Sequence, residues 1–151
     1  MNQYNRFGAA FSLLNRSAQE FFARRIRQFH ISPAQQAYLL ALEPDGEINQ
    51  DEIAHRHQVD KANAARAVAT LERLGYVKRR RAPHDRRQWL VSLTPRGAEV
   101  RTAVERIMRE WVGILEGSVS TGTWRTMVTG LETMARAAAH TADNDRSALE
   151  A

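Results

Sequence analysis

The sequence contains no cysteine. Disulfides, thiolate metal sites, cysteine nucleophiles and thiol-based redox sensing are therefore excluded. It also has no apolar run approaching the roughly 20 residues that a membrane-spanning helix needs. The first residues, MNQYNRFGAAFSLLNRSAQEFF, lack a basic leader followed by an apolar block, so we expect no secretory signal and a cytoplasmic protein.

Patterns typical of catalysis are also missing. We find no glycine-rich phosphate loop, no GxSxG elbow and no HExxH pattern in the sequence. Of the five histidines, His55 and His57 are two residues apart, and on a helix such residues point to different sides. We therefore expect no enzyme activity, no metal and no cofactor.

Positive charge is concentrated in one short segment. The chain holds 22 Lys and Arg against 17 Asp and Glu, a net charge of +5. Residues 78–87 contain six bases and a single acid, Asp85, and outside them 16 bases and 16 acids remain. One cationic site on an otherwise neutral chain favours a polyanionic partner, nucleic acid above all.

Three long segments have the apolar spacing of amphipathic helices. The first covers residues 4–29, the second follows a cap at Thr94, and the third follows a break at residues 118–122. They are too long and too apolar for a small core to cover, so we expect a second copy of the chain to cover them in a symmetric homodimer.

A helix-turn-helix pattern lies between the first two of these segments. Ser32 and Gln35 form a capping box for one helix. Asn49 is expected to cap a short helix, and Asp60 a longer one that ends at Gly75. The outer face of the longer helix is basic, which is typical of a helix that binds DNA.

A β-hairpin is expected directly after this pattern. Residues 76–81 and 88–93 are strand-like, and APHDRR between them predicts an exposed tip. A hairpin that follows a helix-turn-helix is a wing. A nuclear-localisation signal would not need a strand on each side of the basic residues, and a membrane-binding patch would need an apolar face that this loop lacks.

The order of these elements and their local sequence resemble the MarR (multiple antibiotic resistance regulator) family of transcription factors. The resemblance runs from Ser32 to about Val100 and is carried by VDKAN at 59–63, TLERLGYVKR at 70–79, DRRQ at 85–88 and VSLTPRG at 91–97. It implies a mainly α fold with a small β-hairpin wing. A winged helix-turn-helix DNA-binding region (31–97) would lie between dimerisation helices (1–30 and 98–140), with a flexible tail (141–151).

The function implied is that of a dimeric, sequence-specific regulator that binds double-stranded DNA at a pseudo-palindromic operator, as a ligand-responsive repressor. The alternative is a winged-helix module for protein–protein assembly without operator specificity. The basic wing and the basic face of the helix that follows residue 60 point against that alternative.

The helix from residue 61 would enter the major groove with Lys61, Asn63 and Arg66. Arginine and asparagine can each make two hydrogen bonds to one base. The alanines at 62, 64 and 65 cannot donate hydrogen bonds, so we expect sparse base reading and a larger share of shape reading.

The resemblance assigns the wing tip its roles. Asp85 would hold Arg87 and so aim its guanidinium, while Arg86 would reach phosphate or groove. Aiming matters because ordering a long side chain on binding costs free energy. The bases at 78–81 alternate across a strand, so only about half can face DNA, and we expect these to be Arg79 and Arg81.

Family members often sense small aromatic anions between the DNA-binding and dimerisation regions. By that resemblance, Arg16 would meet an aromatic or anionic effector, with Tyr38 and Trp111 as walls of the pocket.

Overall fold

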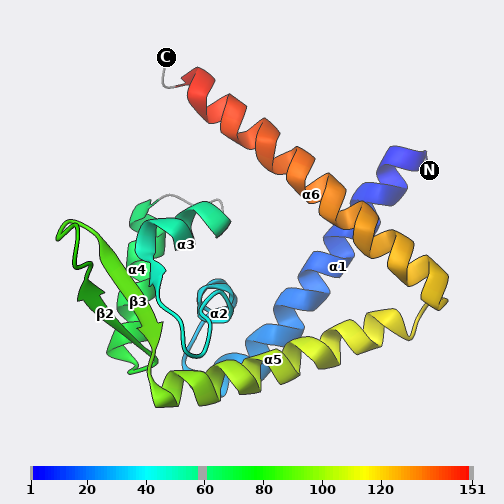
Figure 1. Cartoon of the computed structure of the whole chain (residues 1–151). Helices are drawn as coiled ribbons and strands as arrows, with labels where there is room; N and C mark the ends of the chain where they lie inside the picture. The colour runs from blue at the N-terminus through cyan, green and yellow to red at the C-terminus, as the bar shows by residue number, and fades with distance from the viewer. Residues whose placement is uncertain (1, 58–60, 150–151) are drawn as a thin grey trace. The chain divides into compact units, whose positions relative to one another are not determined.

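The computed structural model describes residues 2–57 and 61–149. Figure 1 shows helices and a small sheet in the order α1 (Gln3–Ile26), η1 (Arg27–Phe29), α2 (Pro33–Leu40), β1 (Ile48–Asn49), α3 (Gln50–His57), α4 (Lys61–Arg73), β2 (Val77–Arg81), β3 (Trp89–Leu93), α5 (Pro95–Glu116) and α6 (Thr121–Leu149). The mainly α fold with a small β-hairpin wing, predicted from the sequence, is confirmed. The chain divides into two units, one up to Trp111 and one from Val112 on, and each is described by itself.

Side-chain caps begin α2 and α3 as the sequence predicts. The Gln35 backbone N–H donates to Ser32 Oγ at 3.2 Å, and the Ser32 N–H donates to Gln35 Oε1 at 2.8 Å. Asn49 caps α3 by accepting from the Asp51 N–H at 2.9 Å. Each cap satisfies backbone donors that the first helical turn leaves unpaired. Asp60, the expected cap of α4, lies outside the described residues.

A three-stranded antiparallel sheet follows, with strand order β1-β3-β2. The two predicted strands of the hairpin are confirmed to within one residue, and Arg81 pairs with Trp89 at the end next to the tip. Strand β1 was not predicted, because two residues are too few to show an alternating pattern. Its pairing of Ile48 with Val91 places the start of α3 beside the hairpin.

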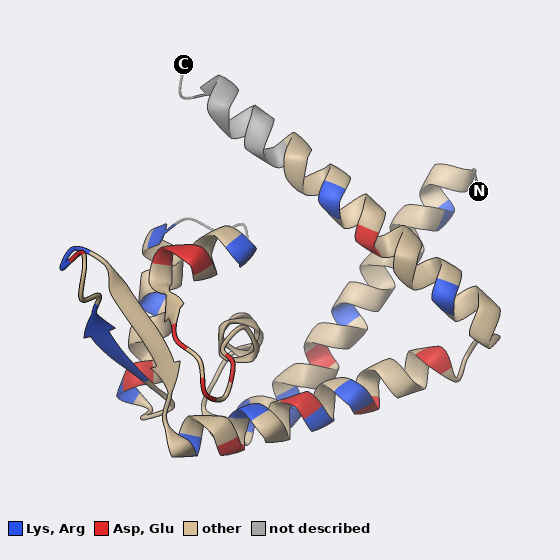
Figure 2. Cartoon of the chain, viewed as in Figure 1, with Lys and Arg blue, Asp and Glu red and all other residues tan. Residues whose placement is uncertain are grey.

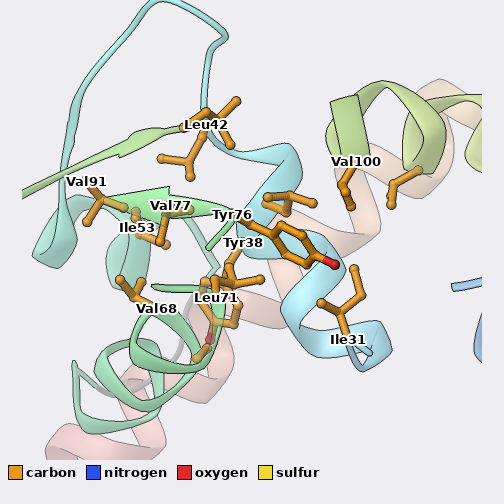
Figure 3. Close-up of a cluster of buried hydrophobic side chains, with 14 of the residues drawn as sticks. Ile31, Tyr38, Leu42, Ile53, Val68, Leu71, Tyr76, Val77, Val91 and Val100 are labelled. Carbon is orange, nitrogen blue, oxygen red and sulfur yellow. The ribbon is translucent and has the colours of Figure 1, made fainter. Parts of the chain in front are cut away.

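The first unit has one hydrophobic core between α2, α3, α4 and the sheet (Figure 3). The C-terminal end of α1 and the N-terminal part of α5 also contribute to it. Leu39, Ile53, Leu71 and Val91 are fully buried in it. Burial of each such side chain stabilises the fold by about 1.5–3 kcal/mol. The helix-turn-helix and the wing therefore share one core.

Helix α4 ends in a turn at Gly75, which has a φ of 76°. The Tyr76 N–H donates to the Leu71 carbonyl and the Gly75 N–H to the Glu72 carbonyl, both at 2.9 Å. This pattern is a Schellman motif, and its left-handed residue favours glycine. The turn sends the chain directly from α4 into the wing.

The base of the wing is joined to α5 through Thr94. Its Oγ1 donates to the Gly75 carbonyl at 2.6 Å and accepts from the Gly97 N–H at 2.9 Å. A Cβ on Gly97 would lie 1.8 Å from the Tyr76 carbonyl oxygen. The first turn of α5 can therefore pack on the backbone of Tyr76 only if residue 97 is glycine.

Large apolar side chains remain exposed in each unit. In α1 the exposed residues include Tyr4, Phe7 and Phe11, and in the second unit they include Met127 and Leu131. These are the surfaces that the expected homodimer would cover. The backbone of α6 runs to Leu149, within the segment expected to be a flexible tail, and the side chains from residue 142 on lie outside the description.

Replacing Gly97 with alanine tests the contact at the base of the wing. Gly97→Ala should lower the free energy of unfolding by about 3 kcal/mol, because the methyl group meets backbone atoms that cannot move aside cheaply. Gly113→Ala is the matched control, since a Cβ there meets nothing within 4 Å. Urea unfolding followed by circular dichroism would measure both. Equal stability of Gly97→Ala and wild type would contradict the packing described.

Candidate nucleic-acid interface

The wing (residues 77–93) carries all six cationic side chains of residues 78–87. Figure 2 shows Lys and Arg along β2, at the hairpin tip and on α4. The tip, residues 82–88, is closed by two backbone hydrogen bonds of 3.0 Å, from the Ala82 N–H to the Gln88 carbonyl and from the Gln88 N–H to the Asp85 carbonyl. The positive charge is therefore presented on a short, hydrogen-bonded hairpin.

Acidic side chains from the body of the protein bind two arginines of β2. Arg79 donates from Nε and Nη2 to Glu72 Oε2 on α4, at 2.8 and 2.6 Å, and is only 23% exposed. Arg80, on the opposite face of the strand, forms an ion pair with Glu47. The hydrogen bond and charge of Arg80 hold the pKa of Glu47 below its usual range. These pairs attach β2 to α4 and to the segment before β1.

Arg81 lies against the ring of Trp89, its strand partner. The guanidinium carbon is 3.8 Å from the ring centroid, and that of Arg79 is 5.1 Å from the same centroid. Such contacts are attractive because the face of an indole ring is electronegative. Of the two strand arginines predicted to face DNA, Arg81 is exposed near the tip, whereas Arg79 is occupied by Glu72.

Asp85 organises the tip. Its Oδ1 accepts the Arg87 backbone N–H at 2.9 Å, and its Oδ2 accepts from Gln88 Nε2 at 3.2 Å. The Arg87 side chain is 95% exposed, with its Nε 3.5 Å from Asp85 Oδ1. The carboxylate thus fixes the backbone of the turn more closely than it holds the guanidinium. Arg86 is exposed beside it.

Helix α4 has a buried face and an exposed face. Ala64, Ala67, Val68 and Leu71 are buried. The three predicted DNA-binding residues of this helix, Lys61, Asn63 and Arg66, are all exposed, as is Ala62. Lys61 Nζ donates to Asp51 Oδ2 on α3 at 2.7 Å. The small side chains among these polar residues leave the helix backbone open to close approach.

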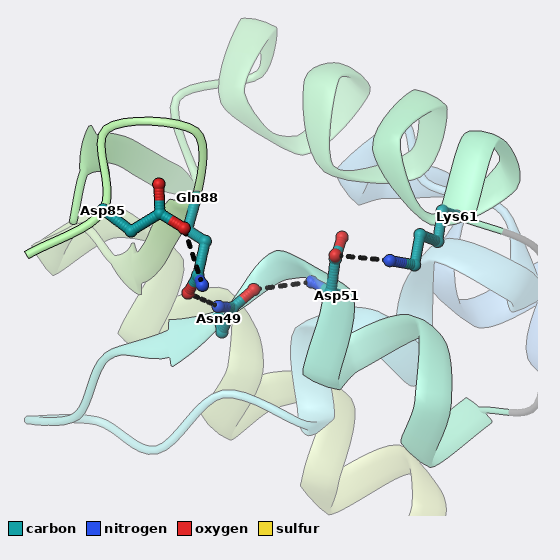
Figure 4. A network of polar contacts seen from close by, with 5 residues as sticks. All are labelled: Asn49, Asp51, Lys61, Asp85 and Gln88. Atoms are coloured by element: carbon teal, nitrogen blue, oxygen red, sulfur yellow. Dashed lines mark hydrogen bonds and ion pairs between the residues drawn. The ribbon is translucent and has the colours of Figure 1, made fainter.

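A polar chain of contacts joins the wing tip to both helices of the helix-turn-helix (Figure 4). Gln88 receives a hydrogen bond from Asn49 Nδ2, and Asn49 also caps α3 through Asp51. Sequence reasoning identified Asn49 only as a cap and did not single out the side chain of Gln88. The two residues are 39 positions apart, so no local pattern pairs them.

The predicted effector residues have different surroundings in the described part of the chain. Arg16 is exposed, Tyr38 is buried in the core, and Trp111 packs on Phe21 and Phe22 with ring centroids 5.1 and 6.1 Å apart. A groove of about 480 Å3 instead lies between α1, α2 and α5, lined by Ala18, Gln19, Phe22, Pro33, Gln36, Ala37, Leu40, Ala41 and Met108. These residues form no motif in the sequence that would have identified them as a binding site.

Over residues 2–57 and 61–149, three or more His, Asp or Glu side chains do not gather anywhere in a way that could hold a metal ion. No helix within the same ranges is long and apolar enough to cross a membrane.

Known proteins are similar to this chain in sequence and in fold. Residues 31–89 match the MarR family. An HTH-type transcriptional regulator of Mycobacterium leprae is 34% identical over 94 residues, which cover 60% of this chain and 66%, just under two thirds, of that protein.

Solved structures extend the likeness over most of the chain. The crystal structure of a MarR transcriptional regulator from Methanosarcina mazei Go1 has a TM-score of 0.79 and 31% identity, covering 89% of this chain and 96% of that one. The Staphylococcus aureus MepR–DNA complex shares the fold, with a TM-score of 0.78 and 22% identity over 87% of this chain and 97% of that one. Because residues 31–89 match the family and the Methanosarcina mazei regulator is 31% identical over 96% of its own chain, this chain belongs to the MarR family.

Proposed function

We propose that the protein is a dimeric transcriptional regulator, acting as a repressor, that binds a pseudo-palindromic site in double-stranded DNA. The observation that carries the proposal is the exposed basic tip of the wing, connected by hydrogen bonds to a helix whose exposed face bears Lys61, Asn63 and Arg66. The Mycobacterium leprae relative is named a transcriptional regulator, and the MepR structure is a complex with DNA. As a transcriptional regulator, the protein would act in the cytoplasm and would catalyse no reaction.

In this proposal α4 is the recognition helix and the wing reads a neighbouring groove. Lys61, Asn63 and Arg66 would contact bases and phosphates of the major groove. Arg81, Arg86 and Arg87 would contact phosphates or the minor groove, whose negative potential attracts arginine. Arg79 would support them from its ion pair with Glu72, and Asp85 would shape the turn that presents Arg87.

A homodimer would place two recognition helices and two wings on one duplex. The exposed apolar residues of α1 and of the second unit supply the surface for a second copy, since large exposed apolar patches mark interaction sites. The two recognition helices should lie about 34 Å apart, one turn of DNA, so the preferred site should be a pseudo-palindrome.

The groove between α1, α2 and α5 is the site where we propose that an effector binds. Of its nine lining residues none is charged, so a carboxylate would lose hydration there without gaining a cation. We therefore favour an aromatic effector over an anionic one. Because α2 packs against α4, a ligand that displaces α2 would change the spacing of the recognition helices and so release DNA.

Two wing substitutions test the roles at the tip. Arg87→Ala should weaken binding to a selected operator at least about tenfold, because each protomer loses a groove contact. Asp85→Ala should weaken it roughly threefold to tenfold although it makes the wing more positive, because the turn loses two acceptors. Asp45→Ala, an exposed acid outside the wing, is the control for charge and should bind at least as tightly as wild type. Fluorescence anisotropy would measure all three. Asp85→Ala that binds like Asp45→Ala would refute the role of the turn.

Salt dependence separates DNA binding from the protein-assembly alternative. Binding to unselected duplex DNA should be measurable at low salt, and log K should fall linearly with log salt by roughly 0.9 per phosphate neutralised. A mobility-shift titration over several salt concentrations would measure the slope. No shift at low salt, or a flat dependence, would favour the assembly module instead.

A matched pair of small aromatics tests the effector groove. Phenol should bind more tightly than benzoate, because the lining of the groove offers no cation to a carboxylate. Ala37→Phe should fill the groove and abolish phenol binding while DNA binding persists. Isothermal titration calorimetry would measure the ligands, with the melting temperature as the check on folding. Equal phenol binding by Ala37→Phe and wild type would place the site elsewhere.

A further inference from the structure

Four contacts form a continuous path from the wing tip to the first residue of the recognition helix (Figure 4). Gln88 Nε2 donates to Asp85 Oδ2 at 3.2 Å, and Gln88 Oε1 accepts from Asn49 Nδ2. Asn49 Oδ1 accepts the Asp51 N–H at 2.9 Å, and Asp51 Oδ2 accepts from Lys61 Nζ at 2.7 Å. The path therefore connects the tip, the start of α3 and the start of α4.

Asn49 occupies the middle of the path because its side chain has two functions. Its carbonyl oxygen caps α3, and its amide nitrogen donates to Gln88. Serine and aspartate are equally good helix caps. Aspartate has no donor for Gln88, and the serine side chain is too short to extend from the cap to the hairpin. A cap alone does not require asparagine here, whereas the path does.

We propose that Asn49 and Gln88 are positioning residues that fix the wing tip against the starts of α3 and α4, and thereby set the separation at which the protein's two DNA-reading elements meet the duplex. This inference rests on the proposed DNA-binding function. It adds that the wing and the recognition helix are coupled by side chains that do not themselves have to touch DNA.

The coupling should affect sequence discrimination more than general affinity. Nonspecific binding comes mainly from phosphate neutralisation, which tolerates a loosely held wing. Specific binding requires the wing and the recognition helix to fit their grooves at the same time. Ordering a mobile tip on binding would cost conformational entropy. A tip already held by Gln88 avoids part of that cost.

Two neutral substitutions and their combination test the proposal in the full-length protein. Asn49→Ser keeps the cap of α3 and loses the bond to Gln88, and Gln88→Met keeps the side-chain length and loses both of its bonds. Each should weaken binding to a duplex selected by wild type from a random-sequence pool by roughly threefold to tenfold. Binding to an unselected duplex of equal length should change less than twofold. The double variant should match the singles, because both break one path.

Two further variants separate positioning from general stability. Gln88→Glu keeps the acceptor for Asn49 and opposes Asp85 with a second carboxylate, so it should lose discrimination as Gln88→Met does. Gln28→Met changes an exposed glutamine whose amide donates to the Arg25 carbonyl at 2.9 Å, and it should match wild type on both duplexes. The melting temperatures of all variants should stay close to that of wild type, since the path is exposed to solvent.

A measurement without DNA keeps this inference separable from the proposed function. Amide 15N relaxation at Arg86 and Arg87 should show a more mobile tip in Asn49→Ser and Gln88→Met than in wild type. If wild type binds no DNA, the proposed function fails while this readout still tests the coupling. Unchanged relaxation, additive effects in the double variant, or equal losses on both duplexes would each overturn the proposal.

Discussion

Thr94 joins the elements that carry the proposed DNA-binding surface. Its hydroxyl bonds to the Gly75 carbonyl at the end of α4, and it caps α5 through the Gly97 N–H. The first turn of α5 then lies directly on the backbone of Tyr76, where the wing begins. Backbone atoms cannot repack as side chains can, so this contact holds the base of the wing, the end of α4 and the start of α5 in one arrangement.

Within that frame, acidic neighbours decide what each arginine of the wing does. Arg79 and Arg80 are bound by Glu72 and Glu47, and they attach β2 to the body of the protein. Arg87, two residues beyond Asp85, remains almost fully exposed. The arginines of the wing are thereby divided into those that attach the strand to the body of the protein and those that remain exposed to solvent. The division follows from position, since Arg79 and Arg80 lie in β2 beside acids of α4 and of the segment before β1, whereas Arg87 lies in the tip.

The proposed effector groove is lined by residues of α1, α2 and α5. Helix α2 contributes to the groove and also packs against α4, so one short helix connects the two sites. A ligand that displaced α2 would therefore also shift α4, because a close-packed core has few voids to absorb the movement. Most residues that line the groove are apolar, so shape and apolar contact would be the main sources of affinity for an effector bound there.

Residue types and their spacing predict the local features: the caps at Ser32 and Asn49, the turn at Gly75, the hairpin around Asp85 and the amphipathic helices. These features depend on interactions between residues within a few positions of one another, so residue type and spacing are enough to predict them. Only the tertiary structure decided that β1 completes the sheet, which arginines are paired, where the groove lies, and that Asn49 meets Gln88 across 39 positions. Those contacts arise when distant segments pack on a common core, and no local pattern encodes which side chains then become neighbours.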